Sequence, residues 1–257
     1  MLALLALSGE AAQPEAWSSH DADSAATVDH SVWQTLLDTY LLAPHSSGIN
    51  RFRYGAVSAA DRERLRDYIA GLAAVDPRRL NRAEQQAYWI NLYNAVTVGL
   101  VVDNYPVASI RRVKGGLLRT GPWDEPVVTV LDVTLSLNDI EHGILRPVYR
   151  DPRIHYAINC ASLGCPNLAP RAYTGTTLDA DLDAAARGFV NAPRGVLLTS
   201  SVLRLSAIYD WFAADFGPDQ AGLLRHLQRY ADPQLAAQLA DFSGAVEYAY
   251  DWALNDP

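Results

Sequence analysis

Residues 82–103 read RAEQQAYWINLYNAVTVGLVVD, and this is the most apolar stretch of the chain with a helical period. Asn81 followed three residues later by Glu84 has the pattern of a capping box, which marks a helix start. The apolar side chains form two adjoining stripes, Tyr88, Leu92, Ala95 and Trp89, Tyr93, Val96. A helix that is apolar over most of its circumference must be buried. The stretch therefore predicts a helix at the centre of the fold.

Two asparagines interrupt this apolar helix. Asn91 and Asn94 are separated by three residues, so both lie on one helical face. A buried side-chain amide needs hydrogen-bond partners. We interpret the pair as ties between the helix and neighbouring loops, and a supporting role for a functional site is the alternative.

Helices are predicted on the N-terminal side of residue 82 and again in the last third of the chain. Val32, Leu36 and Tyr40 share a stripe in the helix that begins at Ser31 and stops at Pro44, and Ser58 caps a helix reaching about Val75. Later helices are predicted at LNDIEHGILR, capped by Ser136 and closed by Pro147, and at LDADLDAAARGFVN, IYDWFAADF and QAGLLRHLQRY.

Strand patterns begin after Pro106. The glycine turn KGG at 114–116 precedes PVVTVLDVTLS, which alternates, and IHYAIN at 154–159 also has a strand pattern. GVLLTSSVLRLS predicts a hairpin around Ser200 and Ser201, and AVEYAYDWALN a last strand. Without internal repeats or a linker after residue 31, the pattern indicates one α+β domain over residues 31–257.

Composition narrows the class of protein. The chain has 257 residues, of which 49% are hydrophobic, and a formal net charge of −8. A surface that follows nucleic-acid phosphates needs clustered Lys and Arg. The sequence therefore predicts a globular protein that does not bind nucleic acid.

The N-terminus, MLALLALSGEAAQPEA, has features of a secretory signal peptide. The apolar run LALLAL at 2–7 precedes small residues around Ala11 and Ala12, although the basic n-region is missing. Residues 13–30 are rich in Ala, Ser, Asp and His without an apolar period, so we expect residues 1–30 to be a signal-peptide remnant and a disordered leader. No later segment has about 18 uninterrupted apolar residues, which predicts no membrane span. We expect a periplasmic or extracellular protein.

Both cysteines of the chain lie in DPRIHYAINCASLGCPNL, residues 151–168. A nucleophilic cysteine must be a thiolate at working pH, which requires a nearby imidazole or backbone N–H groups. Cys160 enters a loop of small residues whose amides can turn toward its sulfur, whereas Cys165 precedes Pro166 and is predicted to be less accessible. The alternatives are a Cys160–Cys165 disulfide and a zinc site. The zinc ligands would be His142, His155, Cys160 and Cys165.

Two histidines are candidates for the base. An extended run from His155 to Cys160 spans about 16 Å and puts the two side chains on opposite faces, so they meet only if the chain bends. A lone histidine in an apolar strand is also commonly a core residue. His142, on a predicted helix, has no such restriction. Glu141 lies about 100° around that helix and could orient a histidine on another element, which leaves a Glu141, His155, Cys160 set open as well.

Several long motifs resemble domain of unknown function family 547. They are AEQQAYWINLYNAVTVGLV, SLNDIEHGILRPVYRDPRIHYAINCASLGCPNL, LDAAARGFVN and EYAYDWALN. The resemblance covers roughly residues 31–255. The family resembles distant, rearranged papain-like and transglutaminase-like cysteine hydrolases. The resemblance implies N-terminal helices, a central apolar helix packed on a mainly antiparallel sheet, and a Cys/His active centre.

The resemblance also assigns roles to residues of this chain. The family's cysteine corresponds to Cys160, its IEH motif to Glu141 and His142, and its strand histidine to His155; the IEH element favours His142 as the base. Asn91 and Asn94 correspond to its WINLYNA helix, and Tyr250, Asp251 and Trp252 to its YDW ending. Supporting roles are expected for the residues Asn91, Asn94, Asn159 and Asp251.

The resulting hypothesis is a thiol-dependent hydrolase or transferase without a cofactor. Cys160 would attack, His142 or His155 would take the proton, and Glu141 would orient the imidazole. A peptide amide is the expected substrate, with a small thiol compound such as glutathione as the other candidate. The competing hypothesis is a module on the same fold that binds a peptide or thiol ligand without turnover.

Overall fold

The computed structural model describes residues 14–113, 121–199 and 202–257. The apolar run at residues 2–7, the KGG turn and the hairpin tip at Ser200 and Ser201 lie outside the described residues. The α-helices are α1 (Pro14–Ser18), α2 (Ser31–Tyr40), α3 (Ala59–Ala73), α4 (Arg82–Asn104), α5 (Ile154–Ala157), α6 (Leu178–Val190), α7 (Ile208–Trp211), α8 (Ala213–Phe216), α9 (Gln220–Tyr230) and α10 (Pro233–Ala240).

Short 3₁₀ and π-helical segments complete the helical part. They are the 3₁₀ turns η1 (Tyr54–Ala56), η2 (Pro77–Arg79) and η3 (Ile110–Arg112), and the π-helix η4 (Asp139–Tyr149).

The strands form three small sheets. Two are antiparallel pairs: β1 (Leu41–Leu42) with β2 (Arg51–Phe52), and β3 (Val128–Val130) with β4 (Val133–Leu135). In the third, β6 (Val202–Ser206) pairs antiparallel with β5 (Val196–Leu198) and parallel with β7 (Ala245–Ala249). The described residues thus confirm an α+β mixture of helices and small, mostly antiparallel sheets.

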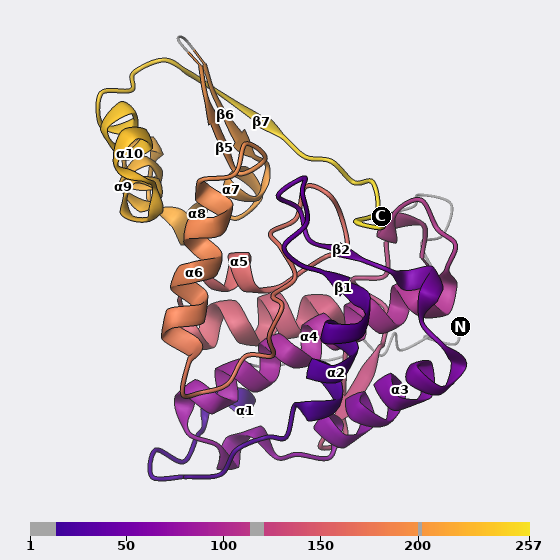
Figure 1. Ribbon diagram of the computed structural model, residues 1–257. Coiled ribbons are helices and arrows are strands. Elements are labelled where there is room, and N and C mark those ends of the chain that lie inside the picture. The colour runs from indigo at the N-terminus through magenta and orange to yellow at the C-terminus, as the bar shows by residue number, and fades with distance from the viewer. Residues whose placement is uncertain (1–13, 114–120, 200–201) are drawn as a thin grey trace, which may run out of the picture.

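The buried side chains form two clusters, and α4 runs through the larger one. Trp89, Ile90 and Leu92 are completely buried on α4, and α2, α3 and η4 supply further members of this cluster. The smaller cluster lies between α6, α9 and the sheet of β5, β6 and β7. Figure 1 shows α4 at the centre of the molecule and this sheet, with α9 and α10, at one end.

The caps predicted for the first long helices are confirmed. The Asn81 side chain accepts a hydrogen bond from the Glu84 amide at 3.0 Å and starts α4, and Ser58 does the same for Asp61 at the start of α3. The Glu84 carboxylate accepts hydrogen bonds from the backbone amides of Val28 and Gly175. The start of α4 is therefore joined to two distant loops.

The segment before residue 31 differs from the predicted disordered leader. Pro14–Ser18 form α1, and Trp17 packs edge-on against Trp89 of α4 with ring centroids 5.2 Å apart. The Gln85 side chain donates to the carbonyl of Ser19 at 2.7 Å. One buried tryptophan and this amide order a segment whose average composition indicated disorder.

The strand predicted at residues 154–159 was wrong. Ile154–Ala157 form the helical turn α5 because Asp151 and Pro152 start a turn: the Asp151 carboxylate accepts a hydrogen bond from the Arg153 amide at 2.9 Å. His155 therefore does not alternate with Cys160 along a strand. The objection that strand geometry raised against this histidine does not apply.

The surroundings of α4 also differ from the prediction. It packs against α3, α6 and η4, and in the described part of the chain no large sheet lies under it. The helix that carries Glu141 and His142 continues through Pro147 as a π-helix to Tyr149, where Arg150 adopts a left-handed conformation with φ of 52°. Pro147 is accommodated inside this wider helix and does not end it.

Within the described ranges, none of the helices is both long and apolar enough to cross a membrane. Papain-like architecture remains an expectation from the resemblance.

Because the side-chain amide of Asn94 is buried and hydrogen-bonded, we expect its substitution to have a large effect on the stability of the fold. It donates to the Ala157 carbonyl and accepts from the Asn159 amide, so Asn94→Ala leaves both groups buried without a partner. We expect the free energy of unfolding, measured by urea denaturation, to fall by about 3 kcal/mol.

Asn104→Ala is the matched control, because this asparagine ends the same helix and, among the described residues, its side chain donates to the Leu100 carbonyl of that helix alone. Its loss should stay below about 1 kcal/mol. Equal losses for the two variants would contradict the role assigned to Asn94.

Candidate functional site

Two asparagine side chains, those of Asn94 and Asn159, hold the loop that carries Cys160 by hydrogen bonds to its backbone. Asn94 on α4 accepts the Asn159 N–H at 2.8 Å and donates to the Ala157 carbonyl at 2.9 Å. The Asn159 side chain accepts from the Ala161 amide and donates to the Pro166 carbonyl, which closes the loop on itself. Because these amides are buried, the backbone on both sides of Cys160 has one favoured position.

The C-terminal segment around residues 251–254 also holds this loop, by backbone hydrogen bonds. Ser162 forms a β-bridge with Leu254, and the amides of Leu163 and Gly164 donate to the carbonyls of Ala253 and Asp251. Gly164 is required there, since a Cβ atom at this position would lie 2.7 Å from the Asp251 amide nitrogen. This contact brings the side chain of Tyr250, from the end of β7, over the Cys160 sulfur.

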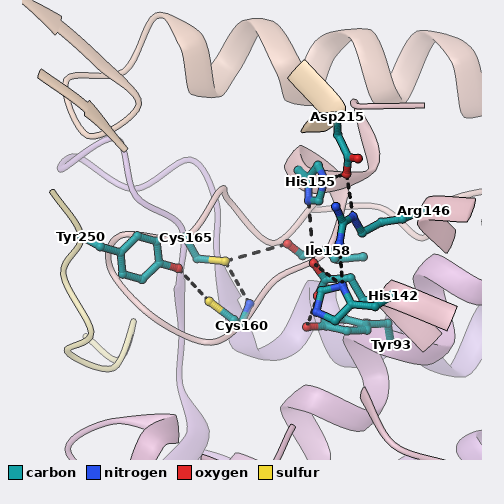
Figure 2. Close-up of polar contacts among 10 residues, drawn as sticks. Tyr93, His142, Arg146, His155, Ile158, Cys160, Cys165, Asp215 and Tyr250 are labelled. Atoms are coloured by element: carbon teal, nitrogen blue, oxygen red, sulfur yellow. Dashed lines mark hydrogen bonds and ion pairs between the residues drawn. The ribbon is translucent and has the colours of Figure 1, made fainter. Parts of the chain in front are cut away.

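Cys160 Sγ lies among hydroxyl groups. The Tyr250 hydroxyl is 2.9 Å away (Figure 2). The Ser162 hydroxyl is 3.2 Å from the sulfur and donates to Tyr250 at 3.0 Å. If Ser162 donates to Tyr250, the Tyr250 hydrogen is available to the sulfur. The second cysteine is adjacent, because the Cys160 amide donates to Cys165 Sγ at 3.0 Å. Both cysteines are free thiols.

The two thiols differ in acidity. Hydrogen bonding from Cys165, assisted by the hydroxyls of Ser162 and Tyr250, lowers the pKa of Cys160 to about 7, although burial opposes the shift. Burial and the neighbouring Cys160 raise the pKa of Cys165 well above its ordinary value. Of the two thiols, Cys160 is therefore the one that loses its proton more readily; it is partly exposed, while Cys165 is only 4% exposed.

A histidine and two carboxyl groups lie deeper in the same region. His155 Nε2 is 2.7 Å from the Asp215 carboxylate, and its ring stacks on Phe212 with centroids 4.3 Å apart. His155 Nδ1 faces Glu141 Oε1 at 3.7 Å, which is too long for a hydrogen bond. Burial lowers the pKa of His155, and burial raises the pKa of Glu141 to about 7. The Glu141 carboxyl accepts a hydrogen bond from Tyr93 at 3.2 Å.

His142 has a different environment. Its side chain is 38% exposed, and its Nδ1 lies 3.3 Å from an Arg146 guanidinium nitrogen and 4.0 Å from Glu141. Burial, followed by the charge of Arg146, lowers the pKa of His142 to about 4. Arg146 also donates to Asp215 at 2.6 Å, so Asp215 joins Arg146 and His155 in one network (Figure 2). His155 is the main cause that lowers the pKa of Asp215.

One cavity of about 440 Å³ connects these groups. Cys160, Cys165, Glu141, His142 and His155 all line it. The remaining wall is largely aromatic and contains Tyr93, Trp123, Trp211, Phe212, Tyr250 and Trp252. Arg111 also lines the cavity, with its guanidinium 5.2 Å from the Trp252 ring centre, and it forms no ion pair with any described residue.

The structure brings some of the predicted site residues together and places others elsewhere. Asn94, Asn159 and the backbone of Asp251 contact the Cys160 loop, whereas Asn91 bonds to Tyr173 and His30. Sequence reasoning missed Asp215, Ser162 and Arg146 as partners. Asp215 stands in FAADF, 60 positions from His155, and nothing in that local pattern marks it.

The candidate zinc ligands do not converge. Across residues 14–113, 121–199 and 202–257, no group of three or more His, Cys, Asp or Glu side chains has an arrangement that could hold a metal ion. Nor does any described histidine nitrogen hydrogen-bond to Cys160 Sγ.

Comparison with known proteins supports part of the resemblance. Residues 77–190 match the model of a family described as "Protein of unknown function, DUF547". The matched part includes Glu141, His142, His155 and both cysteines, but not Asp215 or Tyr250. No curated protein and no solved structure matches the chain.

We expect removal of the Tyr250 hydroxyl beside Cys160 to change the acidity of the Cys160 thiol. Tyr250→Phe removes a donor to the thiolate, so the pH midpoint of iodoacetamide alkylation at Cys160 should rise by about one pH unit. Mass spectrometry of the alkylated peptide checks that Cys160 is the residue modified. Tyr248→Phe is the control, because Tyr248 is 43% exposed on the same strand. An unchanged midpoint in the Tyr250 variant would refute the contact as a source of acidity.

We expect the stability of the wild type relative to a Glu141→Gln variant to depend on pH. Its pKa is about 7 in the folded protein against an ordinary value of 4.5, so its contribution to stability is complete below pH 4.5 and is lost as pH rises through 7. Between pH 4.5 and 8 the wild type should lose about 2 to 3 kcal/mol of unfolding free energy relative to Glu141→Gln.

Urea denaturation at a series of pH values measures this difference. Glu247→Gln, at an exposed position on β7, is the control and should run parallel to the wild type. A Glu141→Gln curve that also runs parallel to the wild type would show that the Glu141 carboxyl is not held protonated by burial.

Proposed function

We propose that the protein is a thiol-dependent hydrolase or transferase in which Cys160 is the nucleophile. The observation that carries this proposal is the position of the Cys160 sulfur, at the wall of a cavity that also contains a buried histidine paired with a carboxylate. A cysteine with a pKa near 7 is substantially thiolate at neutral pH and needs little further activation.

His155 is the proposed acid and base. An ionised carboxylate can only accept, so the 2.7 Å contact with Asp215 requires the hydrogen of a neutral His155 to be on Nε2. Nδ1 then carries the lone pair and lies 3.7 Å from Glu141 Oε1, and both residues line the cavity. The imidazole is thereby oriented by one carboxylate and has its basic nitrogen free, as a general base requires.

His142 has less support as the base. Arg146 occupies the side of its Nδ1 and opposes its protonation, and the Glu141 carboxylate is 4.0 Å from this ring, whereas Asp215 lies 2.7 Å from His155 Nε2. Glu141, with a pKa of about 7, is suited to exchange a proton with His155. This assignment of the base differs from the preference that the IEH motif suggested.

In the proposed reaction the Cys160 thiolate attacks a carbonyl carbon and forms an acyl-cysteine. The bond to the leaving group breaks as that group takes the proton that His155 Nδ1 received from the Cys160 thiol through an intervening water. A second water or an acceptor nucleophile then gives its proton to His155 and attacks the acyl carbon, which releases the acyl product and restores the Cys160 thiolate beside a protonated His155. The aromatic wall and Arg111 fit a substrate with an apolar part and an anionic end. Peptide amides and small thiol compounds such as glutathione belong to this class.

A cysteine, a histidine and a third side chain that orients the histidine form the kind of set that papain-like cysteine hydrolases use, with an asparagine in the third position. Its presence supports the proposed relationship to those enzymes. Export to the periplasm or the extracellular space likewise stays a proposal, resting on the N-terminal sequence.

One observation favours a second candidate, a module that binds a ligand without turnover. No described histidine contacts the Cys160 sulfur directly, so proton transfer would need substrate, water or a side-chain rotation between them. A displaced histidine is sufficient to abolish catalysis on a fold of this kind.

Turnover of p-nitrophenyl acetate separates the two candidates. A hydrolase should release p-nitrophenolate continuously and carry an acetyl group on Cys160 in intact-mass spectra, because the acyl-cysteine forms and is then hydrolysed. His155→Gln should lower the rate by about 10² to 10⁴ and His142→Gln by less than about tenfold.

Cys160→Ala is the control for chemistry at this sulfur, and a wild-type rate in that variant would overturn the proposal. Release of one equivalent followed by no further reaction would identify the binding module. Circular dichroism and iodoacetamide labelling of Cys160 establish that the histidine variants are folded with an intact loop.

A further inference from the structure

Cys165 has no part in the proposed acyl chemistry, yet it shares the cavity with the nucleophile. Both sulfurs line the same wall, one partly exposed and the other buried directly behind it. The arrangement has an accessible thiol for attack and a second thiol within reach of the first.

We propose that Cys160 and Cys165 form a reversible dithiol–disulfide pair that exchanges with small aliphatic disulfides. The inference rests on the reactive Cys160 of the proposed function, but it does not depend on hydrolysis. Its consequence is that the oxidised protein has no nucleophile for acyl transfer.

The loop geometry already satisfies the main requirement of a disulfide. Cys165 Sγ lies 3.0 Å from the Cys160 amide nitrogen, which places it no more than about 4.5 Å from the Cys160 Cα atom. A disulfide needs the Cβ atoms of its two residues about 3.5 to 4.5 Å apart, and a Cys165 sulfur this close to the Cys160 backbone leaves that spacing within reach. Rotation of the Cys160 side chain away from Tyr250 and toward Cys165 is therefore the main movement needed.

The loop between the two cysteines is fixed at several points. Asn159 bonds to Ala161 and Pro166, and the amide of Gly164 bonds to Asp251. Because these bonds do not involve either sulfur, they hold the two residues near each other in the reduced and the oxidised protein. A mixed disulfide on Cys160 would consequently have its resolving thiol beside it.

The exchange balances in two steps. The Cys160 thiolate attacks one sulfur of the small disulfide, an S–S bond to Cys160 forms, and one small thiolate leaves. Cys165 then loses its proton to that thiolate, attacks the Cys160 sulfur and releases the second small thiolate, which takes the remaining proton from solvent. The protein dithiol is oxidised by two electrons and the small disulfide is reduced to two thiols. A small dithiol reverses the reaction.

The surroundings of Cys165 favour the second step. The charge of Cys160 is one cause that raises the pKa of Cys165, and this charge disappears once Cys160 is in the mixed disulfide. The Cys160 amide, which donates to Cys165 Sγ, remains to stabilise the new thiolate. The accessible thiol is thus reactive first and the buried thiol only afterwards, which is the order that exchange requires.

Incubation of the full chain with bis(2-hydroxyethyl) disulfide tests the proposal. The wild type should lose both titratable thiols and become two hydrogen atoms lighter without an adduct, and dithiothreitol should restore both thiols. Trypsin releases both cysteines in one peptide, IHYAINCASLGCPNLAPR at 154–171, so the internal disulfide appears as that single peptide lacking two hydrogen atoms.

Two variants identify the order of events. Cys165→Ser should accumulate one stable mercaptoethanol adduct on Cys160, and Cys160→Ser should react at least tenfold more slowly than the wild type. A stable adduct on the wild type, or no loss of thiols, would overturn the inference. Either result leaves the p-nitrophenyl acetate assay unaffected, so failure here and failure of the proposed hydrolase can be told apart.

Discussion

The side-chain amide of Asn94 makes two hydrogen bonds to the backbone that leads into Cys160, and it does so from the long buried helix α4. Each bond is made away from water, where an unpaired amide or carbonyl costs about 1 to 3 kcal/mol. The position of the cysteine loop is therefore fixed by the core itself. The second attachment, from Gly164 to Asp251, then places the Tyr250 hydroxyl over the sulfur.

Several ionisable side chains around this loop are buried. Glu141 and His155 are 6% and 3% exposed, and burial moves the pKa of each toward the uncharged form. The pKa of Cys160 is shifted toward the charged form instead, because hydrogen-bond donors surround its sulfur. Burying such groups destabilises a fold unless they are paired, so their concentration around one cavity is a mark of a functional site. The same contrast between Cys160 and Cys165 gives the loop its proposed redox behaviour.

The sequence predicted those features that depend on neighbouring residues. The caps at Ser58 and Asn81, the burial of the helix at 82–103 and the greater accessibility of Cys160 over Cys165 all follow from local pattern. The helical turn at His155 was missed because the apolar alternation was read without the Asp151–Pro152 turn signal before it. The packing of residues 14–30 was missed because Trp17, a single side chain, outweighs the polar composition around it. Asp215 and Ser162 could not be assigned, since their roles arise from contacts between distant segments or from a loop conformation that no period describes.

The loop makes Cys160 an acidic thiol, and the thiolate absorbance of the protein in the ultraviolet tests this acidity without any substrate. The measurement is the pH titration of the wild type minus that of Cys160→Ala. The account predicts a midpoint of about 7 in this difference curve, below the ordinary value of 9.0. A midpoint at or above that ordinary value would show that the hydroxyls and Cys165 do not stabilise the thiolate, and would contradict the account.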